Sequence, residues 1–381
     1  MKREEVYLDN NATTPLAPEV LVAMEPYWSE KFGNPGSMHM KGREAREAVE
    51  KSRDILARYL GNEGGIIFTS GATESVNFAL KGALRRAKAV GRTHVVTSLV
   101  EHDAVLETLS ALGDEGFETT YLTPDEYGRI TPAAVRDALR DNTALVAIMH
   151  VNNELGTIYP VNEIASEVKK RDPEIVMFCD GVQAFGKLPV DLTGIDLYAF
   201  SAHKLHGPKG VGALFIRKGI KLQTLINGGG QEFSLRSGTE NVPGIVGLGK
   251  AVELAYATHE ETVRHVRPLR EQFLAGLRAM NNVRINSPED ALYTTLNAAF
   301  LGIPAKTLLE ALEKEVIYAS IGPACAAGKV IQSHVLEALP VSEEIKRSSM
   351  RFGFSKYNTL EEVDYVLGVL NKVVPELRKA A

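Results

Sequence analysis

The sequence predicts an α/β fold in which a mostly parallel central sheet is flanked by helices, with a smaller α+β domain beside it. Three observations lead to this prediction. Between about residues 65 and 217, short apolar runs alternate with amphipathic stretches of helical period. Such alternation is typical of βαβ units and of a largely parallel sheet. The chain has 381 residues, more than a single core usually serves, and its character changes after about residue 257.

The expected strands of the sheet are short and apolar. They are predicted over residues 65–70, 94–98, 118–122, 144–151, 174–180, 195–201 and 212–217. The first strand is followed by apolar residues at helical spacing over three turns, from Val76 to Ala87. Further helices are expected over 104–112 and 161–170, and from Thr131, which suits a helix cap before Pro132.

The rest of the chain predicts the second domain. A long charged helical stretch begins near residue 258 and leads into short strands and helices with less parallel-sheet character. The last helix opens with TLEE at 359–362, which is a capping-box pattern. We therefore expect a large α/β domain of residues 13–257, and a small α+β domain of residues 1–12 and 258–381.

Composition and charge exclude several classes of function. The net charge of −5 gives no basic surface for nucleic acid or an anionic membrane. The N-terminus lacks the apolar core of a signal peptide, and the longest apolar run, at 144–151, is too short to span a bilayer. Two cysteines make no disulfide framework and favour reduced thiols in the cytoplasm. Without a CxxC pair or an HExxH motif, no metal site is expected.

Polar residues follow the carboxyl ends of the expected strands, which is where ligands bind in sheets of this kind. After the first strand, Gly71, Ala72 and Thr73 open a helix. Its free N–H groups suit a phosphate, although an ordinary helix cap explains the same pattern. The later strand ends carry His102, Asn152, Asn153, Asp180, Gln183, Ser201, His203 and Lys204.

These residue types together indicate a pyridoxal phosphate site. Lys204 can bind that cofactor covalently, and the helix N-terminus would hold the phosphate. Asp180 follows a very apolar strand, where a carboxylate is costly unless it meets a cation or donor such as the protonated pyridine nitrogen. A single histidine such as His102 is more often structural than catalytic, so the common position of these residues carries the argument.

The chain resembles the cysteine desulfurases of the NifS/IscS kind, which belong to the class V aminotransferase group of fold-type I pyridoxal phosphate enzymes. The resemblance runs nearly end to end and rests on short motifs in the same order. The motifs are YLDNNATTP (7–15), FGNP (32–35), FTSGATES (68–75), EH (101–102), MHVNNELG (149–156), CDGVQAFGKLPVD (179–191), SAHKLHGPKGVGALF (201–215), GGGQE (228–232), RSGTEN (236–241) and RFGFSKYN (351–358).

The resemblance implies how the cofactor is held. Lys204 would be its covalent attachment, Asp180 the partner of its pyridine nitrogen, and Gln183 the partner of its phenolic oxygen. His102 would stack on the ring and help to move protons. The remaining cofactor contacts would come from Ala72, Thr73, Asn153, Ser201, His203 and, from the second subunit of a homodimer, Thr239.

The resemblance also implies the substrate contacts. Arg351 would clamp the carboxylate of an amino acid with both arms of its guanidinium group. Asn153 would contact the substrate as well, and Asn34 would give supporting contacts.

The implied reaction converts L-cysteine to L-alanine. Cys325 would attack the substrate sulfur as a thiolate and carry it as a persulfide to a scaffold or sulfur-acceptor protein, for iron–sulfur cluster assembly or tRNA thiolation. The small, glycine-flanked neighbours of Cys325 favour a loop that moves between cofactor and partner. By contrast, Cys179 stands in an apolar run and is expected to be a packing residue.

The chain departs from the usual pattern before Cys325. Related sequences usually read SSGSAC, whereas residues 320–325 read SIGPAC, and Pro323 fixes φ and removes an N–H donor. This departure leaves a selenocysteine lyase or an aminotransferase of the same group as alternatives. A non-enzymatic binding or scaffolding subunit is a further alternative, and the retained Lys204, Asp180, His102 and Arg351 argue against it.

Overall fold

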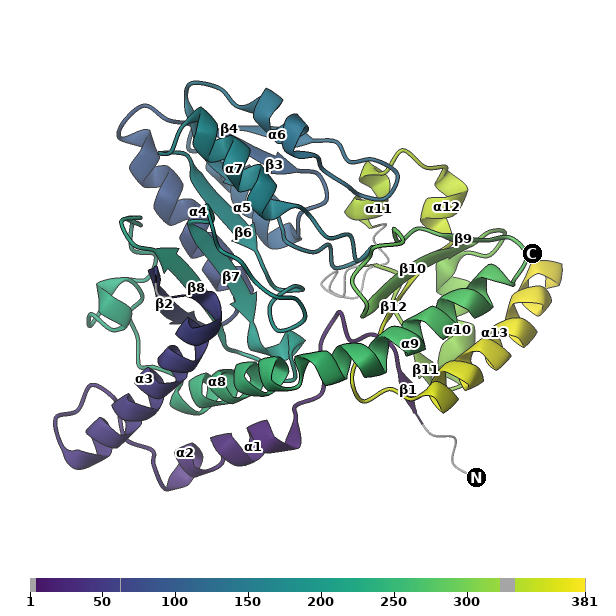
Figure 1. Ribbon diagram of the computed structural model, residues 1–381, viewed down its shortest axis with the longest axis horizontal. Coiled ribbons are helices and arrows are strands. Elements are labelled where there is room, and N and C mark those ends of the chain that lie inside the picture. Colours follow the sequence, from purple (N-terminus) through teal and green to yellow (C-terminus); the bar gives the residue numbers. More distant parts are fainter. Residues whose placement is uncertain (1–4, 62, 323–332, 381) are drawn as a thin grey trace.

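The central sheet of the computed structural model has seven strands in the order β2-β8-β7-β6-β5-β3-β4 (Figure 1). The structure describes residues 5–61, 63–322 and 333–380. The strands are β2 (Gly64–Thr69), β3 (His94–Ser98), β4 (Glu118–Leu122), β5 (Thr143–Ala147), β6 (Val176–Asp180), β7 (Leu197–Ser201) and β8 (Gly212–Arg217). From β7 to β4 all neighbours are parallel, whereas β8 is antiparallel to both β2 and β7. The predicted mostly parallel sheet is confirmed.

All seven predicted strands are present, and the main difference concerns the run at 144–151. There β5 ends at Ala147. The N–H group of Met149 donates to the carboxylate of Glu101 (3.0 Å) rather than to a neighbouring strand. A side chain therefore replaces a strand partner at Met149, while Ile148 and His150 still donate to the Phe178 (3.2 Å) and Asp180 (2.8 Å) carbonyls of β6.

Alternate residues along the strands build one apolar core on each face of the sheet. Val95 and Leu145 face one core, whereas their neighbours Val96 and Val146 face the other. The first core is covered by α4 (Ala72–Lys88) and α5 (Asp103–Gly113). The second is covered by α1 (Pro18–Met24), α3 (Met40–Leu60), α6 (Pro132–Ala138), α7 (Val161–Arg171) and α8 (Val242–Ala257). Cys179 is fully buried in this second core, so its predicted packing role is confirmed.

A third core joins the first strand to the C-terminal elements. β1 (Val6–Tyr7) pairs in parallel with β11 (Ile317–Tyr318), and β9 (Val283–Ile285), β10 (Thr295–Phe300) and β12 (Ser349–Gly353) form an antiparallel sheet. The helices that pack on this core are α9 (His259–Arg278), α10 (Ala305–Lys314) and α13 (Leu360–Ala380) (Figure 1). Two short helices complete this part of the chain: α11 (His334–Ala338), whose buried Val335 and Leu336 belong to the second core, and α12 (Glu343–Arg347). The predicted domain limits at residues 12 and 258 remain predictions.

The loop after β1 crosses from the third core to the central sheet. The Asn10 N–H donates to the Gly353 carbonyl (3.3 Å), and the Thr14 N–H donates to the His203 carbonyl (3.0 Å). Residues 9–14 are thereby fixed beside the end of β7, although they stand at the other end of the chain.

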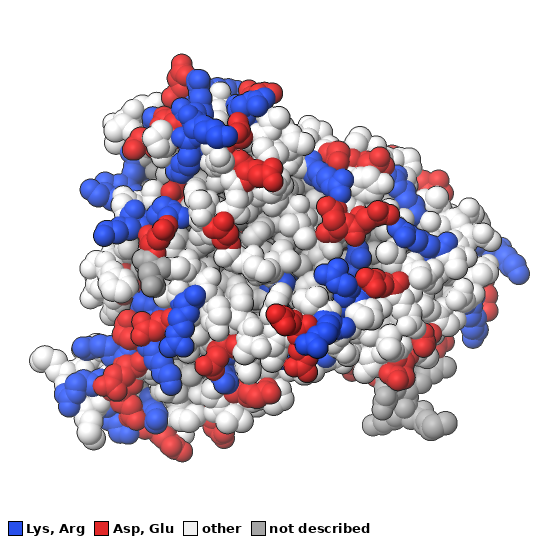
Figure 2. Space-filling view, in the orientation of Figure 1, with Lys and Arg blue, Asp and Glu red and all other residues white. Residues whose placement is uncertain are grey.

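The apolar character of the helices and the distribution of surface charge are relevant to membrane and nucleic-acid binding. Within residues 5–61, 63–322 and 333–380, no helix combines the length and the apolar character needed to cross a membrane. Acidic and basic side chains are interspersed over the face of the molecule shown in Figure 2.

Candidate active site

A cavity of about 420 Å³ lies where the strands β6 and β7 end and the helices α4 and α5 begin. Most of the predicted site residues line it: Ala72, Thr73, His102, Asn153, Asp180, Gln183, Ser201, His203, Lys204 and Arg351. The structure therefore brings together residues that the sequence spreads over nearly 280 positions, as the parallel strand order leads us to expect.

Lys204 stands in a short 3₁₀ turn, Ala202–Lys204, directly after β7. Its Nζ donates to the carbonyl oxygens of Asn11 (2.6 Å) and Ala12 (2.7 Å). Since carbonyl dipoles stabilise an ammonium group, the N-terminal loop holds this amine at the wall of the cavity.

Asp180 ends β6 and is almost fully buried. Burial raises the pKa of its carboxyl group, and the charges of His102 and Lys204, with a hydrogen bond from the Val182 N–H (2.9 Å), act in the opposite direction. A protonated ring nitrogen placed beside this carboxyl would stabilise its charged form.

His102 caps the N-terminus of α5. Its Nδ1 accepts a hydrogen bond from the Ala104 N–H (3.0 Å). A nitrogen that accepts from an amide carries no proton, so the neutral ring of His102 holds its proton on Nε2. The helix cap thus selects one tautomer of a histidine that lines the cavity.

The N-terminus of α4 forms the anion-binding end of the cavity. The helix begins after Gly71 without a side-chain cap, and the Ala72 N–H approaches the Ser201 hydroxyl (3.4 Å). His203 lies next to them, with its Nδ1 3.1 Å from the Thr13 hydroxyl. Burial, together with the charges of neighbouring lysines, lowers the pKa of His203 to about 4, so this ring is neutral at pH 7. A helix N-terminus with an adjacent hydroxyl suits a phosphate.

Gln183 is fixed by hydrogen bonds at both ends of its amide. Its Oε1 accepts from Lys187 Nζ (2.8 Å), and its Nε2 donates to the Asn11 carbonyl (3.0 Å). Burial lowers the pKa of Lys187 to about 7, and the charges of Lys204 and Arg351 add to this. These two bonds fix the orientation of the Gln183 amide, with its oxygen toward Lys187 and its NH₂ group toward Asn11.

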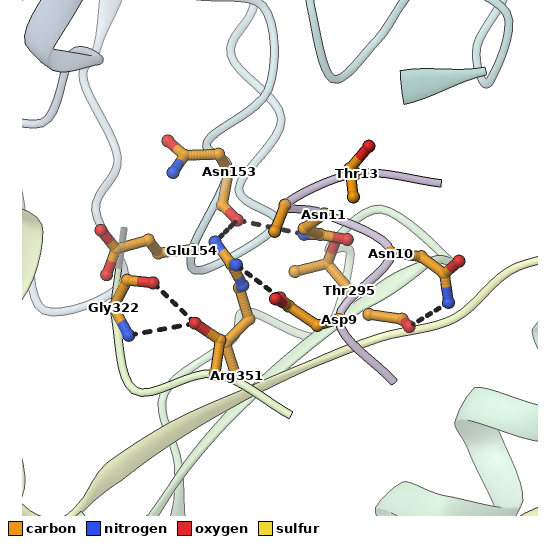
Figure 3. Close-up of polar contacts among 12 residues, drawn as sticks. Asp9, Asn10, Asn11, Thr13, Asn153, Glu154, Thr295, Gly322 and Arg351 are labelled. Carbon is orange, nitrogen blue, oxygen red and sulfur yellow. Dashed lines mark hydrogen bonds and ion pairs between the residues drawn. The ribbon is translucent and has the colours of Figure 1, made fainter. Parts of the chain in front are cut away.

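Arg351 comes from β12 and is 2% exposed. Figure 3 shows its side chain reaching between Asp9 and Asn153. Nη2 bonds to the Asp9 carboxylate (2.8 Å) and Nη1 to the Asn153 carbonyl (3.1 Å). Its buried Nε finds no hydrogen-bond partner among the described residues. The guanidinium group therefore keeps donors with which it can bind a carboxylate ligand.

Three predicted residues are not part of this cavity. Asn34 is exposed, and its side-chain oxygen accepts from the Gly36 N–H (2.8 Å). Thr239 is also exposed and does not line the cavity of its own chain. Cys325, like Pro323, lies outside the described residues.

Five polar residues that contact the site or its walls were not among the residues predicted from the sequence. They are Asp9, Asn11, Glu101, Glu154 and Lys187. Each stands inside or beside a quoted motif, so the signal was adjacency to His102, Asn153, Gln183 or the first strand. Their burial and contacts could not be seen in the motifs.

Glu101 is an example of a residue whose burial and contacts could not be seen in the motifs. It is completely buried, and Oε1 accepts from the Ser98 hydroxyl (2.9 Å) and from the Met149 N–H (3.0 Å). Burial raises the pKa of Glu101 to about 8, and the charge of Asp180 adds to this. The carboxyl is therefore largely protonated at pH 7 and links two strand ends behind His102.

Comparisons with known proteins agree with this arrangement. The family model described as Aminotransferase class-V matches residues 6–366. The chain is 45% identical to the cysteine desulfurase IscS of Methanosarcina thermophila, over 99% of this chain and 94% of that protein. Among solved structures, a NIFS-like protein aligns with a TM-score of 0.92 at 40% identity, covering 98% of this chain and 100% of that one. The structure of SspA in complex with cysteine aligns with a TM-score of 0.80 at 38% identity, over 93% and 100% of the two chains.

Proposed function

Because this chain belongs to the class-V aminotransferase family, we propose that it is a pyridoxal-phosphate-dependent cysteine desulfurase of the NifS/IscS kind. The enzyme converts L-cysteine to L-alanine and passes the sulfur to Cys325 as a persulfide. The observation that carries this proposal is the meeting of Lys204, Asp180 and Arg351 in one cavity. Full-length relatives named cysteine desulfurase support the choice of substrate.

The donors and acceptors of the cavity fit pyridoxal phosphate. The open N-terminus of α4 and the Ser201 hydroxyl can receive a phosphate, Lys204 offers an amine, and Asp180 offers a buried carboxyl to a ring N–H. A volume of about 420 Å³ lies in the range usual for sites of small molecules. When bound, the cofactor serves as an electron sink for negative charge at the substrate α-carbon.

The residues of the chain supply binding, orientation and proton transfer. Arg351 binds the substrate carboxylate, and its burial keeps water from competing for the guanidinium group. His102 exchanges a proton at Nε2, because its Nδ1 is held by the Ala104 N–H. The carbonyl groups of Asn11 and Ala12 receive the Lys204 amine when the substrate replaces it.

Cys325 takes the sulfur in the second half of the reaction. Its thiolate attacks the sulfur of the bound cysteine, so an S–S bond forms and the C–S bond breaks. The electron pair of the C–S bond stays with the carbon fragment, which takes up protons and leaves as alanine. The described residues on either side of Cys325 support this role, because each contacts a residue at or beside the cavity. The backbone of Ser320 pairs with the backbone of Arg351 (2.7 and 3.1 Å), and Ser333 bonds to Glu154 (2.6 Å), which follows Asn153.

The enzyme acts as a homodimer in this proposal. Apolar side chains are exposed over one stretch of α1, α2 (Pro26–Ser29) and the start of α3: Leu21, Val22, Trp28, Phe32, Met38 and Met40. Exposed apolar patches of this kind mark protein interfaces. A second subunit covering such a surface would also explain why Thr239 is exposed in its own chain.

The proposal also covers the setting of the reaction. The sulfur leaves Cys325 for a scaffold or acceptor protein, and serves iron–sulfur cluster assembly or tRNA thiolation. A cytoplasmic location follows from the need for a reduced thiol at Cys325.

The test is a product assay with L-cysteine on the wild type, Cys325→Ala and Cys179→Ala. We expect alanine and an alkylatable persulfide from the wild type, and loss of both from Cys325→Ala. Cys179→Ala is the matched control, since this cysteine is buried in the core, and it should retain activity if the protein folds. Full activity of Cys325→Ala, or no alanine from the wild type, contradicts the proposal. Consumption of a keto acid would indicate an aminotransferase, and cleavage of selenocysteine without Cys325 would indicate a selenocysteine lyase.

A further inference from the structure

Asn11 lies between the two cationic side chains on which the proposed function depends. Its backbone carbonyl accepts a hydrogen bond from Lys204 Nζ (2.6 Å). Its side-chain Nδ2 donates to the Thr295 hydroxyl (2.8 Å) and to the Asn153 carbonyl (3.0 Å). The same Asn153 carbonyl accepts from Arg351 Nη1 (3.1 Å). One residue therefore connects Lys204 to Arg351 through two carbonyl groups. Figure 3 shows the part of this connection that runs from Asn11 through Asn153 to Arg351.

The orientation of the Asn11 amide follows from these contacts. Its Oδ1 is buried and finds no hydrogen-bond partner within the described part of the chain, whereas Nδ2 serves two acceptors. A turned amide would place Oδ1 against the Asn153 carbonyl, so two acceptors would face each other and that bond would be lost, whereas the Thr295 hydroxyl could bond to either end of the amide. Leaving the buried Oδ1 of Asn11 unpaired costs free energy. This orientation of the amide is therefore kept for the bonds that Nδ2 makes.

The strand that carries Arg351 is built to let Asn11 approach. A Cβ atom at Gly353 would lie 2.7 Å from Asn11 Oδ1 and 2.8 Å from Asn11 N, closer than real side chains come. Gly353 stands two residues after Arg351 on β12 and also accepts the Asn10 N–H (3.3 Å). The strand β12 therefore holds both Arg351 and the loop that contains Asn11.

The same loop holds the other arm of Arg351. Asp9 bonds to Nη2 (2.8 Å), and the Ala12 N–H closes a turn on the Asp9 carbonyl (2.9 Å). Ala12 provides the second carbonyl for Lys204 (2.7 Å). A single turn of residues 9–12 thus contacts the guanidinium group at one end and the amine at the other.

We propose that Asn11 is a positioning residue that couples the binding of a carboxylate at Arg351 to the hold on the Lys204 amine. The inference rests on the proposed function for the roles of Arg351 and Lys204. A carboxylate bound by Arg351 competes with the Asn153 carbonyl for Nη1. A shift of that carbonyl reaches Asn11 through Nδ2, and the carbonyl group of Asn11 moves with it.

The coupling has a predictable direction. The carbonyl groups of Asn11 and Ala12 favour the charged form of Lys204, whereas the uncharged amine is the reactive form. A loosened turn therefore leaves the free Lys204 amine more reactive while a carboxylate is bound at Arg351. The negative charge of the ligand acting directly on the ammonium group would have the opposite effect.

The test measures the reactivity of Lys204 in the full-length protein before cofactor is added. Lys204 is labelled by reductive methylation, and its rate is followed by mass spectrometry with and without propionate, a carboxylate that has neither amine nor thiol. We expect propionate to raise the rate in the wild type by roughly threefold to tenfold, the range that loss of one hydrogen bond allows. In Asn11→Ala the rate without propionate should already be raised, and propionate should no longer increase it.

Asn10→Ala is the matched control. Asn10 is equally buried, but its side chain bonds to the Gly353 carbonyl (2.9 Å) and to Asn358 (3.3 Å). This variant should keep the increase caused by propionate. If Asn11→Ala does not fold by circular dichroism, Asn11→Ser gives the same comparison, because a hydroxyl on Cβ is too short to reach both acceptors.

An increase with propionate that persists in the Asn11 variant overturns the proposal, as does its absence in the wild type. The labelling does not depend on desulfurase activity. If the wild type releases no alanine, the proposed function fails while the coupling between the two residues is still decided.

Discussion

Ser333 donates a hydrogen bond from its hydroxyl group to the carboxylate of Glu154 over 2.6 Å, and both residues are almost completely buried. The Ser333 hydroxyl also accepts from the Leu336 N–H (3.2 Å) and so caps α11. The other carboxylate oxygen of Glu154 has no hydrogen-bond partner in the described parts of the chain. Burial raises the pKa of Glu154, and the bond from Ser333 opposes this. A single hydroxyl therefore stabilises both a helix end and a buried acid.

Ser333→Ala is expected to lower the free energy of unfolding by about 1–3 kcal/mol, because it removes a helix cap and leaves a buried carboxyl without its hydroxyl partner. Urea unfolding followed by circular dichroism measures this. Ser342→Ala is the matched control, since Ser342 caps α12 in the same way (3.4 Å) but is exposed. Its loss should be smaller, and equal losses in the two variants would contradict the role assigned to Glu154.

Arg351→Lys is expected to raise the KM for L-cysteine by roughly tenfold to a hundredfold. Lysine keeps the charge but not the planar fork, so it cannot bind a carboxylate with two N–H groups while it also holds Asp9. Steady-state kinetics of alanine release measures KM and kcat separately. Arg347→Lys, at an exposed position on α12, is the control and should leave KM unchanged. A KM that stays at the wild-type value would remove Arg351 from the substrate site.

Asp180→Asn is expected to lower kcat by roughly tenfold to a hundredfold, the loss typical of a hydrogen bond to a charged group. A neutral amide does not favour a protonated ring nitrogen as the Asp180 carboxylate does. The visible spectrum of the cofactor should shift as well, which separates this effect from a change in folding. Asp114→Asn, after the end of α5, serves as the control. An unchanged spectrum and kcat would show that Asp180 does not contact the ring.

Glu101→Gln is expected to change how stability depends on pH. Burial raises the pKa of Glu101 to about 8, above its value of about 4.3 in an unfolded chain. The folded protein therefore binds more protons than the unfolded chain between these values, and its stability falls as the pH rises through this window.

Urea unfolding of the cofactor-free protein at pH 5, 6, 7 and 8 tests this. Asp180 also has a raised pKa and contributes a slope of the same sign in both proteins, so the variant should show a shallower decline rather than none. Glu107→Gln, exposed on α5, should follow the wild type. Parallel curves for Glu101→Gln and the wild type would contradict the assignment.

Much of the fold could be predicted because burial leaves a clear pattern in these strands. β5 and β7 are buried along their whole length, so they appear as continuous apolar runs between helical periods. The partner of Met149 could not be predicted, since its N–H group bonds to the Glu101 carboxylate, and side-chain contacts of this kind leave no periodic signal.

The cavity residues at the ends of parallel strands could be predicted from the sequence. Those contributed by other segments could not. Lys204 and Asp180 follow neighbouring strands, so topology alone places them together. Asp9 and Asn11 are brought there by the pairing of β1 with β11, which joins segments about 310 residues apart and has no local sequence signal. The proposed role of Thr239 requires a second subunit, so a single chain does not test it.

Because β12 supports the N-terminal loop, the parts of the cavity form in a definite order as the polypeptide is synthesised. Residues 9–14 are synthesised about 340 residues before Gly353, which accepts the Asn10 N–H. A nascent chain that stops before β12 has the strand ends and the N-terminus of α4, yet it lacks both Arg351 and a fixed turn to receive Lys204. The proposed ability to bind an amino acid is therefore acquired only after β12 has been synthesised, later than the other residues that line the cavity.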